Sequence, residues 1–317
     1  MMTSETKSFL RTHSYFSFLE SLISPEEIVN RGVQDQIHTL GLTDYRYLTG
    51  AIPFYEACSK VGIKPILGLE IDFTYQGFTG RLTLIAKDIQ GWGNLCRLSS
   101  IMLVDGRIID IQTLEKHSKG LVCLAGNPRG ILKELILNSP PSQFLPNRFI
   151  DALISIFANR IFIEIQRYEN GHLKNEQLLY DLAMNHELPI IASQDILFGD
   201  KRDQPIYRTM TAIKNNTTVQ QVSEDDLPPH SSHFPKWDDF AYRYLDLPQA
   251  IQNLHLLQDQ CTYELPIGQT NYPVFPVPEG LSQSDFLRKK AYAGARSIYH
   301  KLTQEITNRL DYELEII

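Results

Sequence analysis

Short apolar runs that are rich in strand-forming residues recur along this chain, and most of them end in polar residues. They cover residues 9–13, 37–44, 66–70, 121–127, 162–167 and 190–195. Helical patterns lie between them, so the sequence predicts an alternating α/β fold. In barrels and open sheets of this kind, the carboxyl ends of the strands form the functional face. We therefore expect the polar residues at the ends of these runs to share one site.

The first helix is expected to begin after Ser24, with Pro25 at its first position, Glu27 completing a capping box and Gly32 near its end. A second helix is expected over residues 52–60, closed by Gly62. The alternation is then interrupted, because residues 64–75 predict a long strand that residues 77–80 turn into a second strand over 81–87. Further helices are expected over residues 92–102, 112–116, 131–137, 147–158, 173–186 and 247–260.

The composition changes near residue 223. Residues 223–235 are rich in acidic, Pro, Ser and His residues, which predicts a surface loop in which His230 and His233 are solvated. Residues 266–280 are rich in Pro and Gly and predict a connector, and residues 282–317 predict a helical segment with a solvated basic face. We expect two parts, 1–265 and 266–317. The chain ends inside an apparent helix without a C-cap, which favours a fragment or one half of a split protein.

The composition is that of a globular protein, with 43% hydrophobic and 21% charged residues. No apolar run approaches the roughly 20 residues that span a bilayer, and the first residues lack a secretory apolar segment. The four cysteines are widely spaced, which is typical of reduced thiols in a cytoplasmic protein. A net charge of −7 argues against broad electrostatic binding of nucleic acid by this chain alone.

Several segments resemble a known family, beginning with Leu-Arg-Thr-His-Ser-Tyr-Phe-Ser-Phe-Leu-Glu at residues 10–20. The chain is similar to the PHP (polymerase and histidinol phosphatase) domain, specifically the one that begins the alpha subunit of bacterial DNA polymerase III. The segments over residues 275–280 and 309–314 resemble the start of the polymerase palm region. The other segments that carry the resemblance are residues 42–50, 62–70, 84–88, 94–99, 164–167, 275–280 and 309–314.

The resemblance implies a distorted (β/α)7-type PHP barrel whose strand ends bind up to three metals, usually for phosphoester hydrolysis. It carries over five positions as metal ligands: His13, Glu20 (usually Asp), Asp44, Glu70 and Asp195. Several ligand positions of the family are degenerate here. They are Arg11 and Tyr45 in place of histidine, Asn127 where cysteine is frequent, Leu197 in place of histidine, and a strand near Arg81 that lacks the expected histidine.

Arg11 decides how we interpret this site. A guanidinium is effectively never deprotonated, so it would place a fixed cation where the metals should lie. We expect Arg11 to pair with Asp44, Glu70 or Asp195 and neutralise the cluster, with no metal bound. The alternative is one manganese, magnesium or zinc ion held by the remaining carboxylates. Glu164 is expected to be a hydrogen-bonded residue at a strand end rather than a catalyst.

Three functional hypotheses follow. The first is a DNA polymerase III alpha-like replication protein whose PHP region has a degenerate metal site kept for stability or docking between domains. The second is a metal-dependent phosphoesterase or 3′→5′ proofreading exonuclease that uses His13, Asp44, Glu70 and Asp195. The third is a split product that assembles with a separate polymerase chain. The expected partners are palm and thumb modules, in cis or on a separate chain, and proofreading or clamp-associated replisome subunits. DNA is contacted only through the full polymerase, and no membrane is involved.

Overall fold

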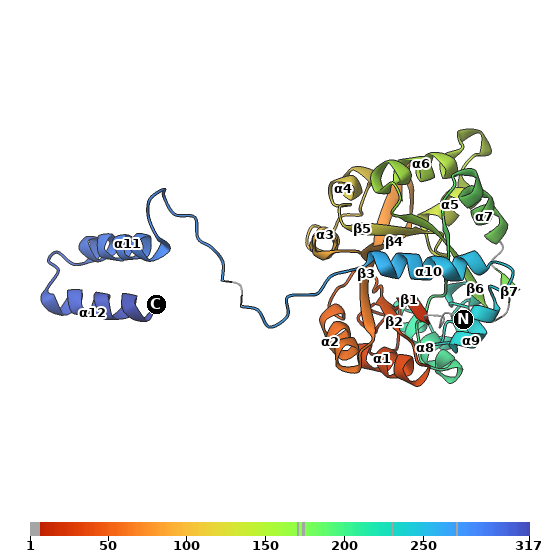
Figure 1. Ribbon diagram of the computed structural model, residues 1–317, viewed down its shortest axis with the longest axis horizontal. Coiled ribbons are helices and arrows are strands. Elements are labelled where there is room, and N and C mark those ends of the chain that lie inside the picture. The colour runs from red at the N-terminus through yellow and green to blue at the C-terminus, as the bar shows by residue number, and fades with distance from the viewer. Residues whose placement is uncertain (1–6, 170, 173–174, 230, 271) are drawn as a thin grey trace, which may run out of the picture. The chain divides into compact units, whose positions relative to one another are not determined.

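The computed structural model describes residues 7–169, 171–172, 175–229, 231–270 and 272–317. The chain divides into two compact units, Met1–Leu265 and Pro266–Ile317. The larger unit contains all the strands, surrounded by helices (Figure 1).

Seven strands of the larger unit form a nearly closed barrel. Neighbouring strands pair in the order β1-β2-β3-β4-β5-β6, and β8 pairs with β6. A parallel bridge between Thr12 and Ile196 then links the end of β8 back to β1, with hydrogen bonds of 3.0 Å on both sides of Ile196. The α/β barrel expected from the sequence is confirmed. Its strands are β1 (Ser8–Thr12), β2 (Thr39–Leu42), β3 (Lys64–Tyr75), β4 (Phe78–Ala86), β5 (Leu121–Ala125), β6 (Ile161–Tyr168) and β8 (Ile190–Ser193), and the short β7 (Gly171–His172) pairs with β6.

One strand distorts the barrel. β4 is antiparallel to both of its neighbours, whereas the other barrel strands run parallel to one another. The turn between β3 and β4 is tighter than the four residues that we predicted, because Gln76 and Gly77 adopt φ values of 51° and 85° and close a two-residue hairpin. Six carboxyl ends therefore point to one side of the barrel.

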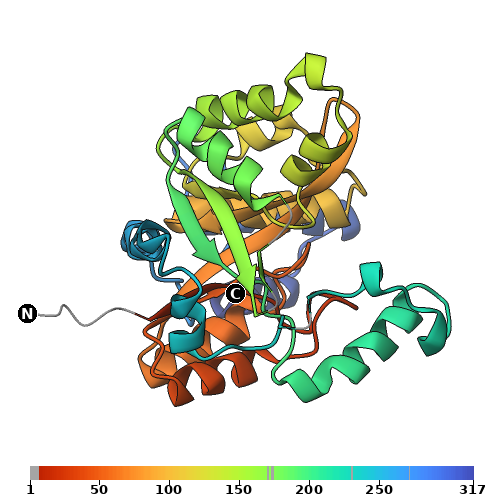
Figure 2. The same ribbon diagram turned by 90° about the vertical axis from the view of Figure 1, so that its right-hand side faces the viewer.

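The helices lie around this sheet (Figures 1 and 2). Ser24 caps the first helix and Gly62 ends the second in a left-handed conformation, as predicted. The Glu27 carboxylate does not complete the predicted capping box. It accepts hydrogen bonds from Arg31, at 2.8 and 3.0 Å. The helices are α1 (Pro25–Gln34), α2 (Ala51–Val61), α3 (Ile89–Leu103), α4 (Ile111–Lys116), α5 (Ile131–Asn138), α6 (Leu145–Phe157), α7 (Glu176–Asn185), α8 (Gln204–Lys214), α9 (Trp237–Tyr242) and α10 (Pro248–Gln260). Residues 173 and 174, where we expected the seventh helix to begin, lie outside the described residues.

α10 covers the amino ends of the strands. The Asn253 amide donates to the carbonyl of Ile190 at 2.7 Å, and the Gln258 side chain accepts from the Ser8 hydroxyl at 2.7 Å. Lys64 donates to the Gln258 carbonyl at 2.6 Å. Ile190, Ser8 and Lys64 are the first residues of β8, β1 and β3, so this end is closed and the opposite end is left for a site.

The prediction of a surface loop over residues 223–235 is wrong for its last part. Residues 231–235 are buried, because the Gln194 amide donates to the carbonyls of Ser231 and His233 and Phe234 packs edge-on against Phe9 at 5.3 Å. His233 is therefore buried rather than solvated, and burial lowers its pKa. His230 lies outside the described residues.

The smaller unit consists of a connector and two helices. The helical segment that we predicted is divided into α11 (Gln283–Ile298) and α12 (Gln304–Ile316), the second capped by Thr303. Asp311 joins them by accepting from Arg288 and from the Tyr292 hydroxyl, both at 2.6 Å. Across the part of the chain that the structure describes, no helix is both long and apolar enough to cross a membrane.

Candidate functional site

Arg11 lies at the centre of the carboxyl-terminal end of the barrel. It belongs to β1 and is only 1% exposed. Its guanidinium donates to Asp195 Oδ1 from Nε at 3.0 Å and from Nη2 at 2.5 Å, and Nη2 also donates to Glu70 Oε1 at 2.9 Å. Nη1 donates to the Thr83 hydroxyl, and Nε lies 3.4 Å from Glu164 Oε1. Arg11 therefore joins strands on both sides of the barrel.

These contacts set the ionisation of the group. Burial alone would lower the pKa of Arg11, but Asp195, Glu164 and Glu70 raise it well above its usual value. Burial would raise the pKa of Asp195, but Arg11, His13 and Arg129 together outweigh burial and lower it. The centre of the barrel is thus a fixed cation surrounded by carboxylates, and Asp195 is held in its ionised form.

Glu70 connects Arg11 to a second arginine. Its Oε2 accepts from Arg81 Nη1 at 2.8 Å, and its Oε1 accepts from the Asn127 amide as well as from Arg11. Arg81 and Arg11 together hold the pKa of Glu70 at about 2, against the effect of burial. The Arg81 guanidinium lies 3.7 Å from the ring centre of Tyr45, whose hydroxyl donates to Asp72 at 2.6 Å.

The Glu20 carboxylate forms ion pairs with three cations at the rim of the barrel. Arg81 Nη2 donates to its Oε1 at 2.9 Å, and Arg129 and Lys214 also donate to its carboxylate. The pKa of Glu20 is lowered to about 2, because Arg129 and Arg81 outweigh burial. The Tyr207 hydroxyl donates to the Glu20 carbonyl at 2.9 Å, so this residue anchors α8 to the barrel.

Asp44 lies in a separate environment from the arginines. Its carboxylate accepts from the Ser14 amide and hydroxyl, both at 2.6 Å, and from the Ser17 hydroxyl at 2.7 Å. Burial raises its pKa to about 6, although the serine hydrogen bonds act in the opposite direction. Asp44 is therefore satisfied by neutral donors, and no ion pair to Arg11 occurs among the described contacts.

Two polar atoms inside the barrel have no hydrogen-bond partner in the described structure. They are Nε2 of His13, which lies 3.5 Å from Asp195 Oδ1, and Oε2 of Glu164. The other oxygen of Glu164 accepts from the Ser193 hydroxyl at 2.7 Å and from the Gln166 amide at 2.5 Å, and burial raises the pKa of this residue. Glu164 is hydrogen-bonded, as the sequence suggested, but it lies within β6 rather than at its end.

The resemblance implies divalent metals at this position, and the donor set does not fit them. Asp195 Oδ1 accepts twice from Arg11, both oxygens of Glu70 accept from cations, and Asp44 is covered by serine donors. Among the residues that the structure describes, no three His, Cys, Asp or Glu side chains are grouped so that they could hold an ion. A guanidinium occupies the point toward which the carboxylates converge.

The structure brings most of the expected site residues together and adds others. Asp195, Glu70 and Arg11 are in direct contact, and His13 is their neighbour. Glu20 is linked to them through Arg81, whereas Leu197 is buried beside Phe198 and Tyr207 in a separate apolar cluster. Sequence reasoning missed the roles of Arg81, Arg129, Lys214, Thr83, Ser14 and Ser17. For Arg81 a signal existed, because it lies on the strand where the family's histidine is missing.

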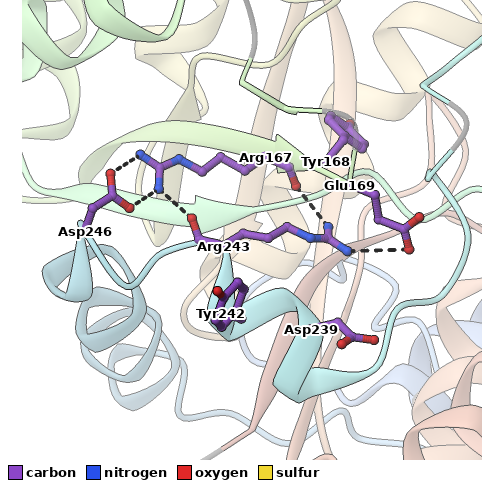
Figure 3. Close-up of a pocket in the computed structure, with 7 residues that line it drawn as sticks. All are labelled: Arg167, Tyr168, Glu169, Asp239, Tyr242, Arg243 and Asp246. Atoms are coloured by element: carbon purple, nitrogen blue, oxygen red, sulfur yellow. Dashed lines mark hydrogen bonds and ion pairs between the residues drawn. The ribbon is translucent and has the colours of Figure 1, made fainter.

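A hollow of about 570 Å³ lies beside the carboxyl end of β6 (Figure 3). Arg167 pairs there with Glu176 at 2.7 Å and with Asp246 at 2.5 and 2.9 Å. Arg243 donates to the Arg167 carbonyl at 3.2 Å and to Gln194 at 2.6 Å. The contacts of both arginines join β6 to α9 and to the segment before α10. These structural contacts account for the two arginines at this hollow.

The chain is similar to known proteins over nearly all its length. DNA polymerase III subunit alpha of Bacillus subtilis (strain 168) is 29% identical over 315 residues, which cover 97% of this chain and 28% of that protein. The protein of the same name from Rickettsia bellii (strain RML369-C) is 30% identical over 334 residues, with the same coverage. This chain thus spans little more than a quarter of these relatives.

One match among solved structures is a putative metal-dependent phosphoesterase from Bifidobacterium adolescentis. It has 12% sequence identity and a TM-score of 0.42, and the match covers 60% of this chain and 87% of that one. The PHP domain family matches residues 10–168, half of the sequence. The chain therefore belongs to the PHP domain family.

Proposed function

We propose that this chain is the PHP region of a DNA polymerase III alpha-like replication protein, and that its barrel is a structural and docking module rather than a hydrolase. The observation that carries the proposal is the Arg11 guanidinium, buried and bonded to Asp195 and Glu70. Arginine retains its charge at all accessible pH values. It therefore supplies the positive charge that these carboxylates need, without supplying the activated water that hydrolysis needs.

The smaller unit supports a docking role. Among its described residues, α11 buries only Ala295 and α12 buries none, so this unit has almost no core of its own. Leu287, Ile298 and Tyr312 are exposed by 42%, 74% and 56%. We infer that these apolar side chains pack against polymerase palm and thumb modules, in the same chain or in a separate one. DNA would be contacted through the assembled polymerase, because the chain itself is acidic.

The unpartnered Nε2 of His13 and Oε2 of Glu164 favour a second candidate. It is a metal-dependent phosphoesterase or 3′→5′ exonuclease, in which Arg11 would have to leave the centre so that one divalent ion could enter. This requires breaking the contacts of Arg11 with three carboxylates and one hydroxyl. The cost of leaving those carboxylates unpaired makes it the weaker candidate.

Metal content separates the two candidates. Purified protein is incubated with manganese or zinc, desalted and analysed for bound ions, and hydrolysis of phosphate esters and of single-stranded DNA ends is assayed in parallel. The structural proposal expects substoichiometric metal and no hydrolysis for the wild type and for Arg11→His, because the other histidines of a metal centre are still missing. One or more ions per chain, with activity that Asp44→Asn abolishes, would establish the enzyme instead.

A further inference from the structure

One part of the larger unit is packed against the barrel without joining its main core. It consists of α8 and the turns that follow it, and we call residues 204–227 the α8 arm. In Figure 2 the arm extends outward beside the barrel. Its apolar side chains belong to a small separate cluster, formed by Tyr207, Met210 and Leu227 with Leu22, Leu197 and Phe198. The main core therefore does not hold the arm in place.

The arm is fixed where it begins and is held more weakly beyond that point. Just before it, the Asp200 carboxylate accepts from Arg31 of α1 at 2.7 Å. Along the arm, the Tyr207 hydroxyl donates to the Glu20 carbonyl at 2.9 Å, and Lys214 donates to the Glu20 carboxylate. The Lys214 side chain is 41% exposed, and ion pairs open to solvent contribute little to stability. Asp200 can therefore act as a hinge point, whereas the contacts at Glu20 can be released.

Close packing is interrupted where the arm meets the rim of the barrel. A hollow of about 160 Å³ lies there, with Tyr207, Thr211 and Lys214 on the side of the arm and Glu20 and Arg81 on the side of the barrel. Atoms that line an unfilled space lose the van der Waals contacts that a close-packed interior provides. The arm therefore gains less from lying against the rim than an element of the main core gains from its neighbours.

The arm is also joined to itself. The Arg208 guanidinium of α8 donates to the carbonyl of Val219 at 3.1 Å, to that of Val222 at 2.7 Å and to the Glu224 carboxylate at 2.7 Å. One side chain thus connects the helix to both of the turns that follow it. Because these bonds lie inside the arm, they are kept when the arm moves away from the barrel.

We propose that the α8 arm is a lid that opens from the rim as one unit while the barrel remains folded. In the closed position it shares the hollow with Glu20 and Arg81, whose side chains are only 4% and 15% exposed. Arg81 joins Glu20 to Glu70 in the centre of the barrel. Opening of the arm therefore gives solvent a route to the buried ion cluster. This motion does not depend on whether the barrel binds a metal.

Thiol labelling of the full chain measures the opening. Thr211→Cys places a thiol on the covered side of the arm, where Thr211 is 4% exposed, and Cys96→Ser removes the partly exposed native cysteine. Cys123 is the internal control, because it is fully buried in the barrel and reacts only when the barrel unfolds. Below the urea transition, we expect the introduced thiol to react with DTNB about tenfold faster than Cys123 or more, as for a local opening. Low urea concentrations should barely change its rate, because opening exposes little surface.

Three variants in this background identify the contacts that keep the arm closed. Tyr207→Phe keeps the ring and loses the hydrogen bond to Glu20, so it should speed labelling of the introduced thiol about fivefold and leave Cys123 unchanged. Tyr242→Phe is the matched control, since Tyr242 is 73% exposed on α9, outside the arm, and should change neither rate. Arg208→Gln removes bonds inside the arm, so it should leave the opening of a lid unchanged.

Equal rates for the introduced thiol and for Cys123 would overturn the inference, because the arm would then open only when the barrel unfolds. Equal acceleration of both thiols by Tyr207→Phe would overturn it for the same reason. Acceleration by Arg208→Gln as large as that by Tyr207→Phe would show that α8 melts instead of moving as a unit. Protection of Cys123 reports that each variant is folded, and Met210→Cys repeats the test within the same apolar cluster if Thr211→Cys loses that protection.

Discussion

Replacing Arg11 by methionine tests whether the buried cation stabilises the barrel. Methionine has an unbranched side chain of similar volume, so much of the packing is retained while the charge and its hydrogen bonds are lost. Asp195 then loses both of its contacts with Arg11, and Glu70 keeps Arg81 but loses Arg11. The variant therefore leaves the buried Asp195 carboxylate largely uncompensated, and Glu70 keeps only one of its two arginine partners.

The expected cost follows from this arrangement. Removing one partner of a buried ion pair destabilises a protein by about 3–5 kcal/mol, because the other charge remains buried. In domains of this size, 1 kcal/mol shifts the melting temperature by about 2 °C or slightly more. We therefore expect Arg11→Met to melt roughly 6–10 °C below the wild type at pH 7. Arg202→Met is the control, since its side chain is 85% exposed and its nearest carboxylate lies at 3.7 Å. It should change the free energy of unfolding by less than about 0.5 kcal/mol.

The pH dependence separates lost charge from lost packing. In the wild type the pKa values of Glu70 and Asp195 are depressed, so their pairing stabilises the fold above about pH 4, and this contribution is lost as the pH falls toward about 2. In Arg11→Met the buried Asp195 can instead accept a proton. The difference in unfolding free energy between the wild type and Arg11→Met should therefore be largest at pH 7 and become smaller toward pH 4. Urea denaturation of both proteins across that range measures it. A variant as stable as the wild type at pH 7, or a difference independent of pH, would refute the ion-pair explanation.

Two further predictions concern the other carboxylates. Burial raises the pKa of Asp44 to about 6, above its unfolded value near 4, so wild-type stability should fall by up to about 3 kcal/mol as the pH rises from about 4 to about 6. Asp44→Asn should flatten that part of the urea-denaturation profile, and an unchanged slope would contradict the assignment. Glu20 has its pKa lowered to about 2, so Glu20→Gln should lose stability above about pH 4 and approach the wild type at lower pH. Because Glu20 holds Lys214 and Tyr207, hydrogen exchange in α8 should quicken in this variant more than in α2, and equal protection of α8 would show that the anchor is unimportant.

The alternation of strands and helices could be predicted because each element has a local pattern. β3 spans Lys64–Tyr75, as its apolar residues and the following turn indicate, and Ser24 and Gly62 act as helix caps. Local patterns do not give the closure of the barrel, which depends on Thr12 meeting Ile196 across 184 positions of sequence. We also did not predict α8, although Pro205 lies at its start and Tyr207, Thr211 and Ala212 form its buried face at helical spacing.

The site was only partly predictable for the same physical reason. The identity of Arg11 is enough to predict an ion pair, since a buried guanidinium needs carboxylates. Which carboxylates it contacts is a matter of side-chain direction. Asp44 follows β2 but bonds to two serines of the loop after β1, whereas Glu164 lies within β6 and approaches Arg11 to 3.4 Å. Lys214 entered the site only with the unpredicted α8, so no pattern near residue 214 could have placed it beside Glu20.

For the metal-free barrel that we propose, the arrangement also predicts that one substitution would not create a metal centre. Removing Arg11 alone leaves Asp195 unpaired, and removing Asp195 alone leaves a buried guanidinium short of its partner, so each change is costly while both together can be nearly neutral. Arg81 couples Glu70 to Glu20, and Glu20 couples both to Arg129 and Lys214. After a change to histidine at residue 11, Glu70 would still form its ion pair with Arg81. Among the described residues, His13 would supply the other nearby imidazole. A metal site would require several coordinated replacements, each unfavourable alone, and for this reason we expect Arg11→His to bind no metal.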